Sequence, residues 1–348
     1  MVQEIDIGSF FKTNVPLIDV RSPGEYEKAH IPGAVNIPLF SDHERTQVGT
    51  AYVQQSKEKA MELGYQYVNP KLNDFISQSK QVAPNGRVVA HCWRGGMRSH
   101  SFAQHLHDNG FADVSVISGG YKAYRTHIHN TFDIPFHLNI IGGYTGSAKT
   151  LVIKHLQQKG LQAVDLEDLA KHKGSAFGGI DNHVQPTVEQ FENNLFEVWR
   201  KIDYKQPIWL EDESHNIGGV NIPMNLFTQM RNSPVYFLEI PKEERAKHLV
   251  TEYANANPEM LSDSISKISK RLDGQKTKEA FQYLSEKKFY EVALIALDYY
   301  DKSYLKGMKF RDPEKVFIIQ KNNTDPVENA ASIMQFYEQH ERYKTNPV

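Results

Sequence analysis

The chain has 348 residues, 40% of them hydrophobic, with one cysteine and a formal net charge of −2. This composition excludes a disordered chain, and the length is sufficient for two domains. A single cysteine excludes an internal disulfide, and the near-neutral charge means that any nucleic acid would have to meet a local basic patch. Residues 1–6 lack the features of a secretory signal, and no apolar run approaches the roughly 18 residues of a spanning helix. We therefore expect a cytoplasmic protein that does not enter a membrane.

The first 130 residues have the pattern of an α/β domain. Apolar runs separated by helical stretches predict strands at 15–20, 34–38, 88–91 and 114–117. Strands that alternate with helices imply a mostly parallel sheet, with its ligand site beyond the carboxyl ends of the strands.

Residues 41–80 are longer and more charged than a simple connection and predict a helical insertion in this domain. Within it, the composition from Gln54 to Leu63 favours a helix that ends at Gly64.

A second α/β domain is expected over residues 131–240, after a junction near 130–135. It opens with a strand at 138–141, a glycine-rich loop and a helix that runs to about residue 159. Further apolar runs predict strands at 163–165, 207–210 and 234–238. Residues 241–348 have helical composition, and we expect them to pack on the second domain.

The first chemical motif is the loop that contains the only cysteine. A strand leading into Cys-x5-Arg places the thiol in a nest of backbone N–H groups before a helix, which favours an anion and lowers the thiol pKa. Two glycines would allow positive φ angles, and two arginines would add contacts to a tetrahedral oxyanion. The alternative is a buried cysteine in an ordinary turn. The predicted catalytic residue is Cys92, and the predicted anion loop is Trp93, Arg94, Gly95, Gly96, Met97, Arg98 and Ser99.

This part of the chain resembles the rhodanese family. The resemblance is carried by Asp19-Val20-Arg21-Ser22-Pro23-Gly24-Glu25-Tyr26, by residues 30–38, by the Cys92 loop and by residues 119–124. It implies a cysteine that carries sulfur or selenium as a persulfide or perselenide. The loop is one residue longer than the usual Cys-x4-Arg and is similar to that of the phosphatase and arsenate reductase branch. A wider loop suits a whole oxyanion such as phosphate, arsenate or selenophosphate.

The second motif is a Walker-like loop between a predicted strand and a predicted helix, which is the context such a loop requires. Its backbone N–H groups would wrap a diphosphate, its lysine would neutralise the charge, and its threonine could reach Mg²⁺. Ala148 replaces the usual last glycine, and its methyl group is tolerable only if φ stays negative. The predicted diphosphate or nucleotide loop is Gly143, Tyr144, Thr145, Gly146, Ser147, Ala148, Lys149 and Thr150.

Acidic residues at two strand ends are candidates for holding Mg²⁺ near this loop. They are Asp165, Glu211, Asp212 and Glu213. Such residues equally often cap a helix N-terminus, so the metal role of each is an open alternative. We expect neither a tightly bound cofactor nor a structural metal site.

Over residues 19–304, the chain resembles the bacterial tRNA 2-selenouridine synthase family. Beyond the two loops, the resemblance is carried by residues 42–52, 165–178, 185–193 and 211–218. It implies a rhodanese-like domain followed by a P-loop NTPase-like domain with a helical C-terminal region. It also implies an enzyme that converts 2-thiouridine at the tRNA wobble position into 2-selenouridine. The sulfur would first be alkylated with geranyl diphosphate, and selenium from selenophosphate would then displace the geranylthio group.

These substrates need an apolar trough and a basic surface. Candidate trough residues lie in the insertion, although an ordinary core explains them better: Tyr52, Val53, Ala60, Met61, Leu63 and Tyr65. Candidate phosphate contacts for tRNA, or simply a solvated face, are Lys267, Lys270, Arg271, Lys276, Lys278, Lys287 and Lys288.

Two other functions fit parts of the pattern. A phosphatase or arsenate reductase with an appended nucleotide-binding domain would need a general acid near Cys92 and no tRNA. A non-catalytic module would use the Cys92 loop only to bind anions. The sequence does not distinguish a nucleotide, geranyl diphosphate or a tRNA phosphate at the Walker-like loop.

Overall fold

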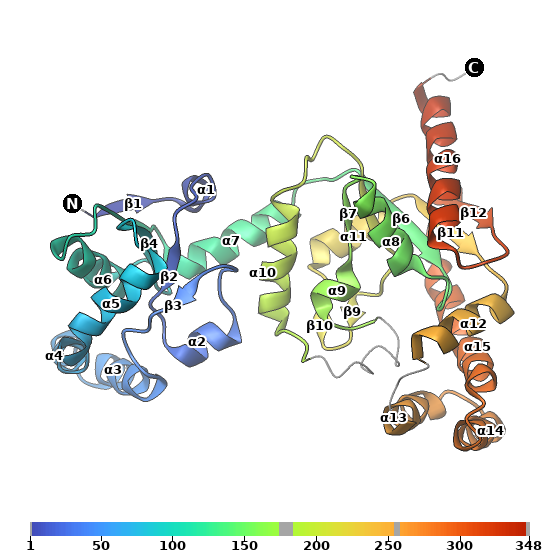
Figure 1. The fold of residues 1–348 in the computed structure, drawn as a ribbon, viewed down its shortest axis with the longest axis horizontal. Helices are drawn as coiled ribbons and strands as arrows, with labels where there is room; N and C mark the ends of the chain where they lie inside the picture. The colour runs from blue at the N-terminus through green and yellow to red at the C-terminus, as the bar shows by residue number, and fades with distance from the viewer. Residues whose placement is uncertain (1, 174–183, 254–257, 346–348) are drawn as a thin grey trace. The chain divides into compact units, whose positions relative to one another are not determined.

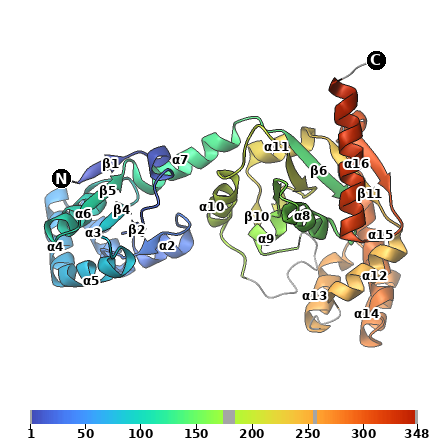
Figure 2. The same ribbon diagram turned by 45° about the horizontal axis from the view of Figure 1, so that its top comes forward.

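The computed structural model describes residues 2–173, 184–253 and 258–345, which form two compact units (Figures 1 and 2). Unit 1 comprises Met1–Thr131 and Glu192–Glu197, and unit 2 comprises Phe132–Phe191 and Val198–Val348. Each unit contains a five-stranded parallel sheet, which confirms the predicted α/β class. No helix in the described part of the chain is long and apolar enough to cross a membrane.

The sheet of unit 1 has the strand order β1-β5-β4-β2-β3, and every neighbouring pair is parallel. Its strands are β1 (Gln3–Ile5), β2 (Leu17–Asp19), β3 (Val35–Asn36), β4 (Arg87–His91) and β5 (Asp113–Ile117). The apolar runs predicted all of these except β1. The helices are α1 (Ile7–Phe10), α2 (Pro23–Lys28), α3 (Asp42–Gln54), α4 (Lys57–Val68), η1 (Asn69–Lys71), α5 (Leu72–Val82), α6 (Met97–Asp108) and α7 (Gly120–Phe132).

The helical insertion is present, but one predicted helix end is wrong. Two helices, α3 and α4, replace the single helix expected from Gln54 to Leu63, and α4 continues through Gly64 to Val68. Gly64 is buried, and a Cβ placed there would lie 3.5 Å from the Phe40 ring. Gly64 therefore serves close packing inside a helix and does not terminate it.

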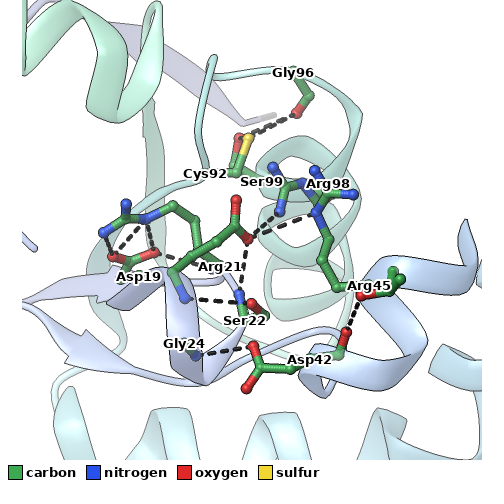
Figure 3. A network of polar contacts seen from close by, with 12 residues as sticks. Asp19, Arg21, Ser22, Gly24, Asp42, Arg45, Cys92, Gly96, Arg98 and Ser99 are labelled. Atoms are coloured by element: carbon green, nitrogen blue, oxygen red, sulfur yellow. Dashed lines mark hydrogen bonds and ion pairs between the residues drawn. The ribbon is translucent and has the colours of Figure 1, made fainter. Parts of the chain in front are cut away.

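A buried ion pair fixes the end of β2. Asp19 and Arg21 are almost fully buried, and Arg21 Nη2 lies 2.6 Å from Asp19 Oδ2 (Figure 3). Arg21 also donates to the Ala29 carbonyl at 2.8 Å, and its guanidinium lies 4.0 Å from the centre of the Tyr121 ring. The Asp-Val-Arg motif is thus a structural element that holds the loops around β2 together.

Six residues distant in sequence complete unit 1. They are the centre of α10 (Val188–Trp199). Asn193 is fully buried, and its amide nitrogen donates to the Tyr121 hydroxyl and to the His30 carbonyl, each at 2.8 Å. The sequence did not predict that residues 192–197 pack in unit 1. A domain boundary at residue 131 therefore leaves out this part of unit 1.

The sheet of unit 2 has the order β12-β11-β6-β8-β7, again entirely parallel. Its strands are β6 (Leu138–Gly143), β7 (Ala163–Val164), β8 (Ile208–Glu211), β11 (Val235–Glu239) and β12 (Val316–Gln320). A small antiparallel pair is formed by β9 (Asn216–Ile217) and β10 (Val220–Asn221). Helices α8 (Lys149–Gln158), α9 (Leu166–Ala170) and α11 (Met224–Asn232) belong to the same part of the chain.

The C-terminal region is mostly helical, as predicted, but it also supplies the edge strand β12. Its helices are α12 (Lys242–Tyr253), α13 (Pro258–Ser269), α14 (Gly274–Ser285), α15 (Phe289–Met308), η2 (Pro313–Lys315) and α16 (Pro326–Thr345). Figures 1 and 2 show α12 to α15 grouped together, whereas α16 packs along α8. The region therefore belongs to the P-loop unit through both its sheet and its helices.

Candidate functional site

The cysteine loop connects β4, the middle strand of unit 1, to α6. Its shape depends on Gly95, which has φ +62°, because a Cβ there would lie 2.4 Å from the Ile117 carbonyl oxygen. Gly120 is equally required, since its Cβ would lie 2.3 Å from the Cys92 carbonyl oxygen. The Tyr121 and Lys122 amides donate to carbonyls of the cysteine loop, both at 2.9 Å. The glycine-rich motif at 119–124 is thus the platform on which this loop rests.

Gly96 does not use the positive φ expected of it. Its φ is −98°, it is the N-cap residue of α6, and a Cβ there would meet open space. The cradle therefore needs one left-handed residue in this loop, Gly95, and not two.

Cys92 is buried and surrounded by donors. Its Sγ lies 3.3 Å from the Ser99 hydroxyl, which lies in the first turn of α6 (Figure 3). Burial alone would raise the pKa of the thiol, but the Ser99 hydroxyl, the Arg98 charge and the Ser99 and Arg94 amides outweigh it. The net effect lowers the Cys92 pKa, which favours the nucleophilic thiolate.

The two loop arginines differ in their surroundings. Arg94 is exposed, whereas Arg98 Nη1 lies 3.1 Å from Glu25 Oε2. Glu25 also completes the capping box of α2 with Ser22, and Arg45 Nε lies 3.7 Å from the same Glu25 oxygen. Figure 3 shows Arg98 beside Ser99 and Cys92, with Arg45 nearby. Glu25 therefore orients Arg98 at the loop. It belongs to the segment that resembles the rhodanese family, but the sequence did not predict it as a site residue.

The Walker-like loop occupies the equivalent position in unit 2, between the middle strand β6 and α8. Gly146 has φ +80°, and a Cβ there would lie 2.9 Å from the Arg245 carbonyl oxygen. Ala148 has φ +59°, so the negative φ that would accommodate its methyl group without strain is not present. An alanine in the left-handed region costs roughly 1–2 kcal/mol. The loop keeps its cradle shape despite the substitution and carries this strain.

Contacts from α12 and α15 brace the loop. Arg245 donates to the Thr145 carbonyl at 3.0 Å and pairs with Asp301 at 2.8 Å. The Tyr304 hydroxyl accepts from the Gly143 amide at 3.3 Å and donates to Asp212 Oδ2 at 2.6 Å. Neither Arg245 nor Tyr304 has a local sequence signal, because each reaches the loop from a helix about 100 or more residues away.

Two carboxylates contact the loop threonine, and a third lies close to both of them. Thr150 Oγ1 lies 2.8 Å from Glu167 Oε2 and 3.0 Å from Glu211 Oε2. Oxygen atoms of Glu167, Glu211 and Glu213 lie within 4.8 Å of one another, close enough to bind one cation. Hard oxygen ligands beside a P-loop threonine are the ligands that Mg²⁺ prefers. Glu167 was missed as a site residue, although it lies two positions after the predicted Asp165.

The same cluster has perturbed proton affinities. Burial, together with the charge of Glu167, raises the pKa of Glu213 to about 8, although Lys149 opposes the shift. Burial and the neighbouring carboxylates likewise raise the pKa of Glu211 well above its usual value. The Thr150 hydroxyl has one proton and can donate it to only one of the two carboxylates. Both contacts are hydrogen bonds if Thr150 donates to Glu167 and a protonated Glu211 donates to the Thr150 oxygen. A divalent cation would replace such protons.

Two predicted acids have other partners. Asp165 is the N-cap of α9, where it accepts the Asp168 amide at 2.8 Å. Asp212 is bound by the Tyr304 hydroxyl and by Arg311, and Arg231 Nη1 lies 3.6 Å from it. Neither belongs to the three-carboxylate group.

A polar cavity of about 960 Å³ lies over the Walker-like loop. Lys149 lines it and donates to the Gly143 carbonyl at 3.0 Å. Of the candidate tRNA contacts, Lys267 and Arg271 line this cavity, whereas Lys276 and Lys288 pair with acids on the helical surface. The lining also includes Lys154, Lys171, Lys173, Arg231, Tyr299 and Tyr300. Such a charged cavity suits a phosphate-bearing ligand.

Two family models match this chain, and each match includes one of the two loops. The family described as "tRNA 2-selenouridine synthase AAA domain" matches residues 136–335, more than half of the chain, and "Rhodanese-like domain" matches residues 9–127. The chain belongs to the tRNA 2-selenouridine synthase family. The predicted family and the order of its two domains are thereby confirmed. Residues 174–178 of the quoted family segments lie outside the described residues.

Two curated relatives illustrate this family membership. The tRNA 2-selenouridine synthase of Sulfurovum sp. (strain NBC37-1) is 34% identical over 87% of this chain and 91% of its own length. That of Nitrosomonas europaea is 37% identical over 73% of this chain and 67% of its own length. A solved N-terminal domain of a putative ATP/GTP binding protein from Clostridium difficile 630 is 42% identical, covering 37% of this chain and 98% of that chain, with a TM-score of 0.35.

Proposed function

We propose that this chain is a cytoplasmic tRNA 2-selenouridine synthase that replaces the sulfur of wobble 2-thiouridine by selenium. Geranyl diphosphate and selenophosphate are its small-molecule substrates. The observation that carries the proposal is the pairing, in a member of this family, of a Cys-x5-Arg loop whose buried cysteine contacts Ser99 with a Walker-like loop that faces a charged cavity.

The first step alkylates the thiouridine. The sulfur of the thiouridine attacks the geranyl carbon that bears the diphosphate. A C–S bond forms, the bond from that carbon to the diphosphate oxygen breaks, and inorganic diphosphate leaves. Charge accumulates on the departing diphosphate, so Lys149 and the backbone amides of the Walker-like loop would stabilise it. Glu167, Glu211 and Glu213 would hold a Mg²⁺ ion that neutralises further charge on the phosphates.

The second step introduces selenium. Selenophosphate carries selenium at the oxidation level of selenide, so joining it to Cys92 as a perselenide would need an oxidant. Attack of the Cys92 thiolate on phosphorus needs none: an S–P bond forms, the P–Se bond breaks, and hydrogenselenide leaves. Hydrogenselenide then displaces geranylthiol from the uridine, and water releases phosphate from Cys92. The Cys-x5-Arg loop suits this route because it is wide enough for a tetrahedral phosphoryl group.

Nucleoside mass spectrometry of 2-thiouridine-containing tRNA tests the function. Geranyl diphosphate alone should give the geranylthio nucleoside, and both substrates together should give selenouridine. Cys92→Ser should reduce the rate of selenouridine formation by at least about 100-fold while the protein remains folded. A 2-thiouridine tRNA left unchanged by the folded wild-type protein would refute the proposal.

The phosphatase or arsenate reductase alternative needs a general acid close to Cys92. Among the described residues, no aspartate or glutamate lines the cavity that contains Cys92. This disfavours the alternative. Rapid turnover of an aryl phosphate without tRNA would restore it.

A further inference from the structure

A second cavity, of about 840 Å³, opens beside Cys92 within unit 1. Helices α3 and α4 of the insertion supply one part of its lining, and the cysteine loop and α6 supply another. Its volume falls within the roughly 300–1,000 Å³ of small-molecule sites.

The lining of this cavity exposes an unusual amount of apolar surface. Tyr52 is 62% exposed, Val53 81%, Tyr65 52% and Met97 48%, and all four line this one cavity. The expectation that the apolar residues of the insertion form an ordinary core is therefore wrong for the first three. Apolar side chains gathered around one cavity favour a ligand with an apolar part.

The charged residues in the lining of the cavity are all cationic, although Arg98 and Arg45 also contact Glu25, which lies outside the lining. Arg45, Lys57, Arg94 and Arg98 line it, and no described acidic residue does. The thiol of Cys92 lies in the same lining. Apolar walls with cationic groups and a nucleophile fit an amphiphile that has a hydrocarbon tail and an anionic reactive end.

We propose that this cavity binds the ten-carbon geranyl chain of the S-geranyl nucleotide of tRNA, with its carbon–sulfur bond directed toward the Cys92 loop. The inference rests on the proposed function, in which the chain exists in two forms, geranyl diphosphate and the S-geranyl nucleotide. The diphosphate of the first form is assigned to the Walker-like loop of the other unit, so the cavity beside Cys92 is assigned to the second form. When selenium displaces geranylthiol, the departing chain would remain in the apolar walls beside Cys92.

Two substitutions, one on each insertion helix, test the cavity. Val53→Asp and Tyr65→Asp place a charge in the apolar lining at exposed positions, where folding should tolerate it. Gln54→Asp and Gln66→Asp place the same charge one residue further along at exposed positions outside this cavity. Circular dichroism and thermal melting would verify that all four full-length variants fold.

Calorimetric titration with geranyl diphosphate, dimethylallyl diphosphate and inorganic diphosphate then isolates the contribution of the chain. The wild-type protein and both controls should bind the ten-carbon compound at least about 10-fold more tightly than the five-carbon one. In Val53→Asp and Tyr65→Asp this ratio should stay at least about 10-fold, because the Walker-like loop holds the donor, and affinity for inorganic diphosphate should also stay unchanged. A fall to about 2-fold or less in both cavity variants would assign the cavity to geranyl diphosphate and overturn the inference for the nucleotide.

A parallel titration with anticodon stem-loops that carry 2-thiouridine or S-geranyl-2-thiouridine identifies the source of the chain. If Val53→Asp and Tyr65→Asp lose the geranyl preference only with the RNA, the cavity binds the S-geranyl nucleotide. If they lose it only with the diphosphate compounds, the cavity binds geranyl diphosphate. If neither preference changes while the tRNA products still form, the cavity inference fails and the proposed function stands. If the preference is lost but wild-type protein yields no modified nucleoside, the function fails and the prenyl site stands.

Discussion

At the scale of single residues, the reactivity of Cys92 depends on a balance between burial and donors. Burial disfavours the thiolate, whereas the Ser99 hydroxyl, 3.3 Å from Sγ, and the Arg98 charge favour it. The Ser99 hydroxyl also lies 3.1 Å from the Gly96 carbonyl, so its one proton is donated either to that carbonyl or to the thiolate. The loop that would hold the oxyanion substrate thus also lowers the pKa of the thiol.

Ser99→Ala should raise the Cys92 pKa and slow alkylation of the thiol by iodoacetamide at pH 7. Loss of one hydrogen bond to the thiolate predicts a decrease of roughly 2- to 10-fold. The rate should recover at high pH, where the thiolate forms without help. Ser77→Ala, which changes an exposed serine of α5, is the control. Equal rates for the Ser99 variant and wild type at pH 7 would show that Ser99 does not set the pKa.

Ala148 offers a test of backbone strain at the Walker-like loop. Ala148→Gly removes backbone strain of roughly 1–2 kcal/mol from the folded state. The glycine also increases the entropy of the unfolded chain, which destabilises the folded state by about 0.5–1 kcal/mol. We expect a net stabilisation of about 0.5–1 kcal/mol, visible as a higher Tm. Ala103→Gly, inside α6, should instead destabilise by about 1 kcal/mol. A lower Tm for Ala148→Gly would mean that the methyl group contributes packing that exceeds the strain.

At the scale of elements, the loops that carry chemistry are held by contacts from other segments. The buried pair of Asp19 and Arg21 joins β2 to the loop after α2, and Gly120 packs directly behind the cysteine loop. Burying both charges is tolerated because they pair with each other, and removal of Arg21 would leave only the His91 side chain, 3.5 Å away, beside the buried Asp19 carboxylate.

Arg21→Ala should therefore destabilise unit 1 by about 3–5 kcal/mol, measured by urea denaturation. Arg87→Ala is the matched control, because Arg87 and Asp113 form an exposed pair 3.3 Å apart on the same sheet. An exposed pair contributes about 0–1 kcal/mol. Similar losses in the two variants would argue against a special role of the buried pair.

The sequence predicted the elements whose signals are local. Apolar runs such as Val88–Ala90 identify central strands, and a glycine-rich loop after such a run identifies each site. It missed β1 and β12, which are edge strands that gain their structure by pairing with β5 and β11 far along the chain. Glu167 was missed for the same reason: only the folded sheet brings it to Thr150 and Glu211. Exposure of the insertion's apolar residues likewise depends on tertiary packing, which periodicity does not encode.

At the scale of the whole molecule, two units repeat one arrangement. In each, the middle strand of a parallel sheet ends in a glycine-containing loop that leads into a helix and is proposed to bind an anion, and other segments brace that loop. The difference lies in the cavities: one is apolar with a thiol in its lining, and the other is charged, with three clustered carboxylates. This division matches a reaction that needs both a hydrocarbon site and a phosphate site.

The carboxylate cluster makes the stability of the molecule depend on pH and on Mg²⁺. The folded pKa of Glu213 is raised to about 8, so folding favours its protonated form. This contribution is complete below the unfolded pKa of about 4.5 and is lost as the pH rises through 8. Mg²⁺ should replace the protons and restore stability on the alkaline side.

We therefore expect Mg²⁺ alone to raise the Tm at pH 8.5 and to have almost no effect at pH 6. At ten times Kd the stabilisation is roughly 1.4 kcal/mol, or about 3–6 °C for a unit of this size. At pH 6, protonation of Glu213 alone weakens binding by about 100-fold. Glu213→Gln should reduce the Mg²⁺-induced shift, whereas Asp263→Asn, an exposed acid of α13, should leave it intact. A shift that is equal at both pH values, or unchanged in Glu213→Gln, would show that the cation binds elsewhere.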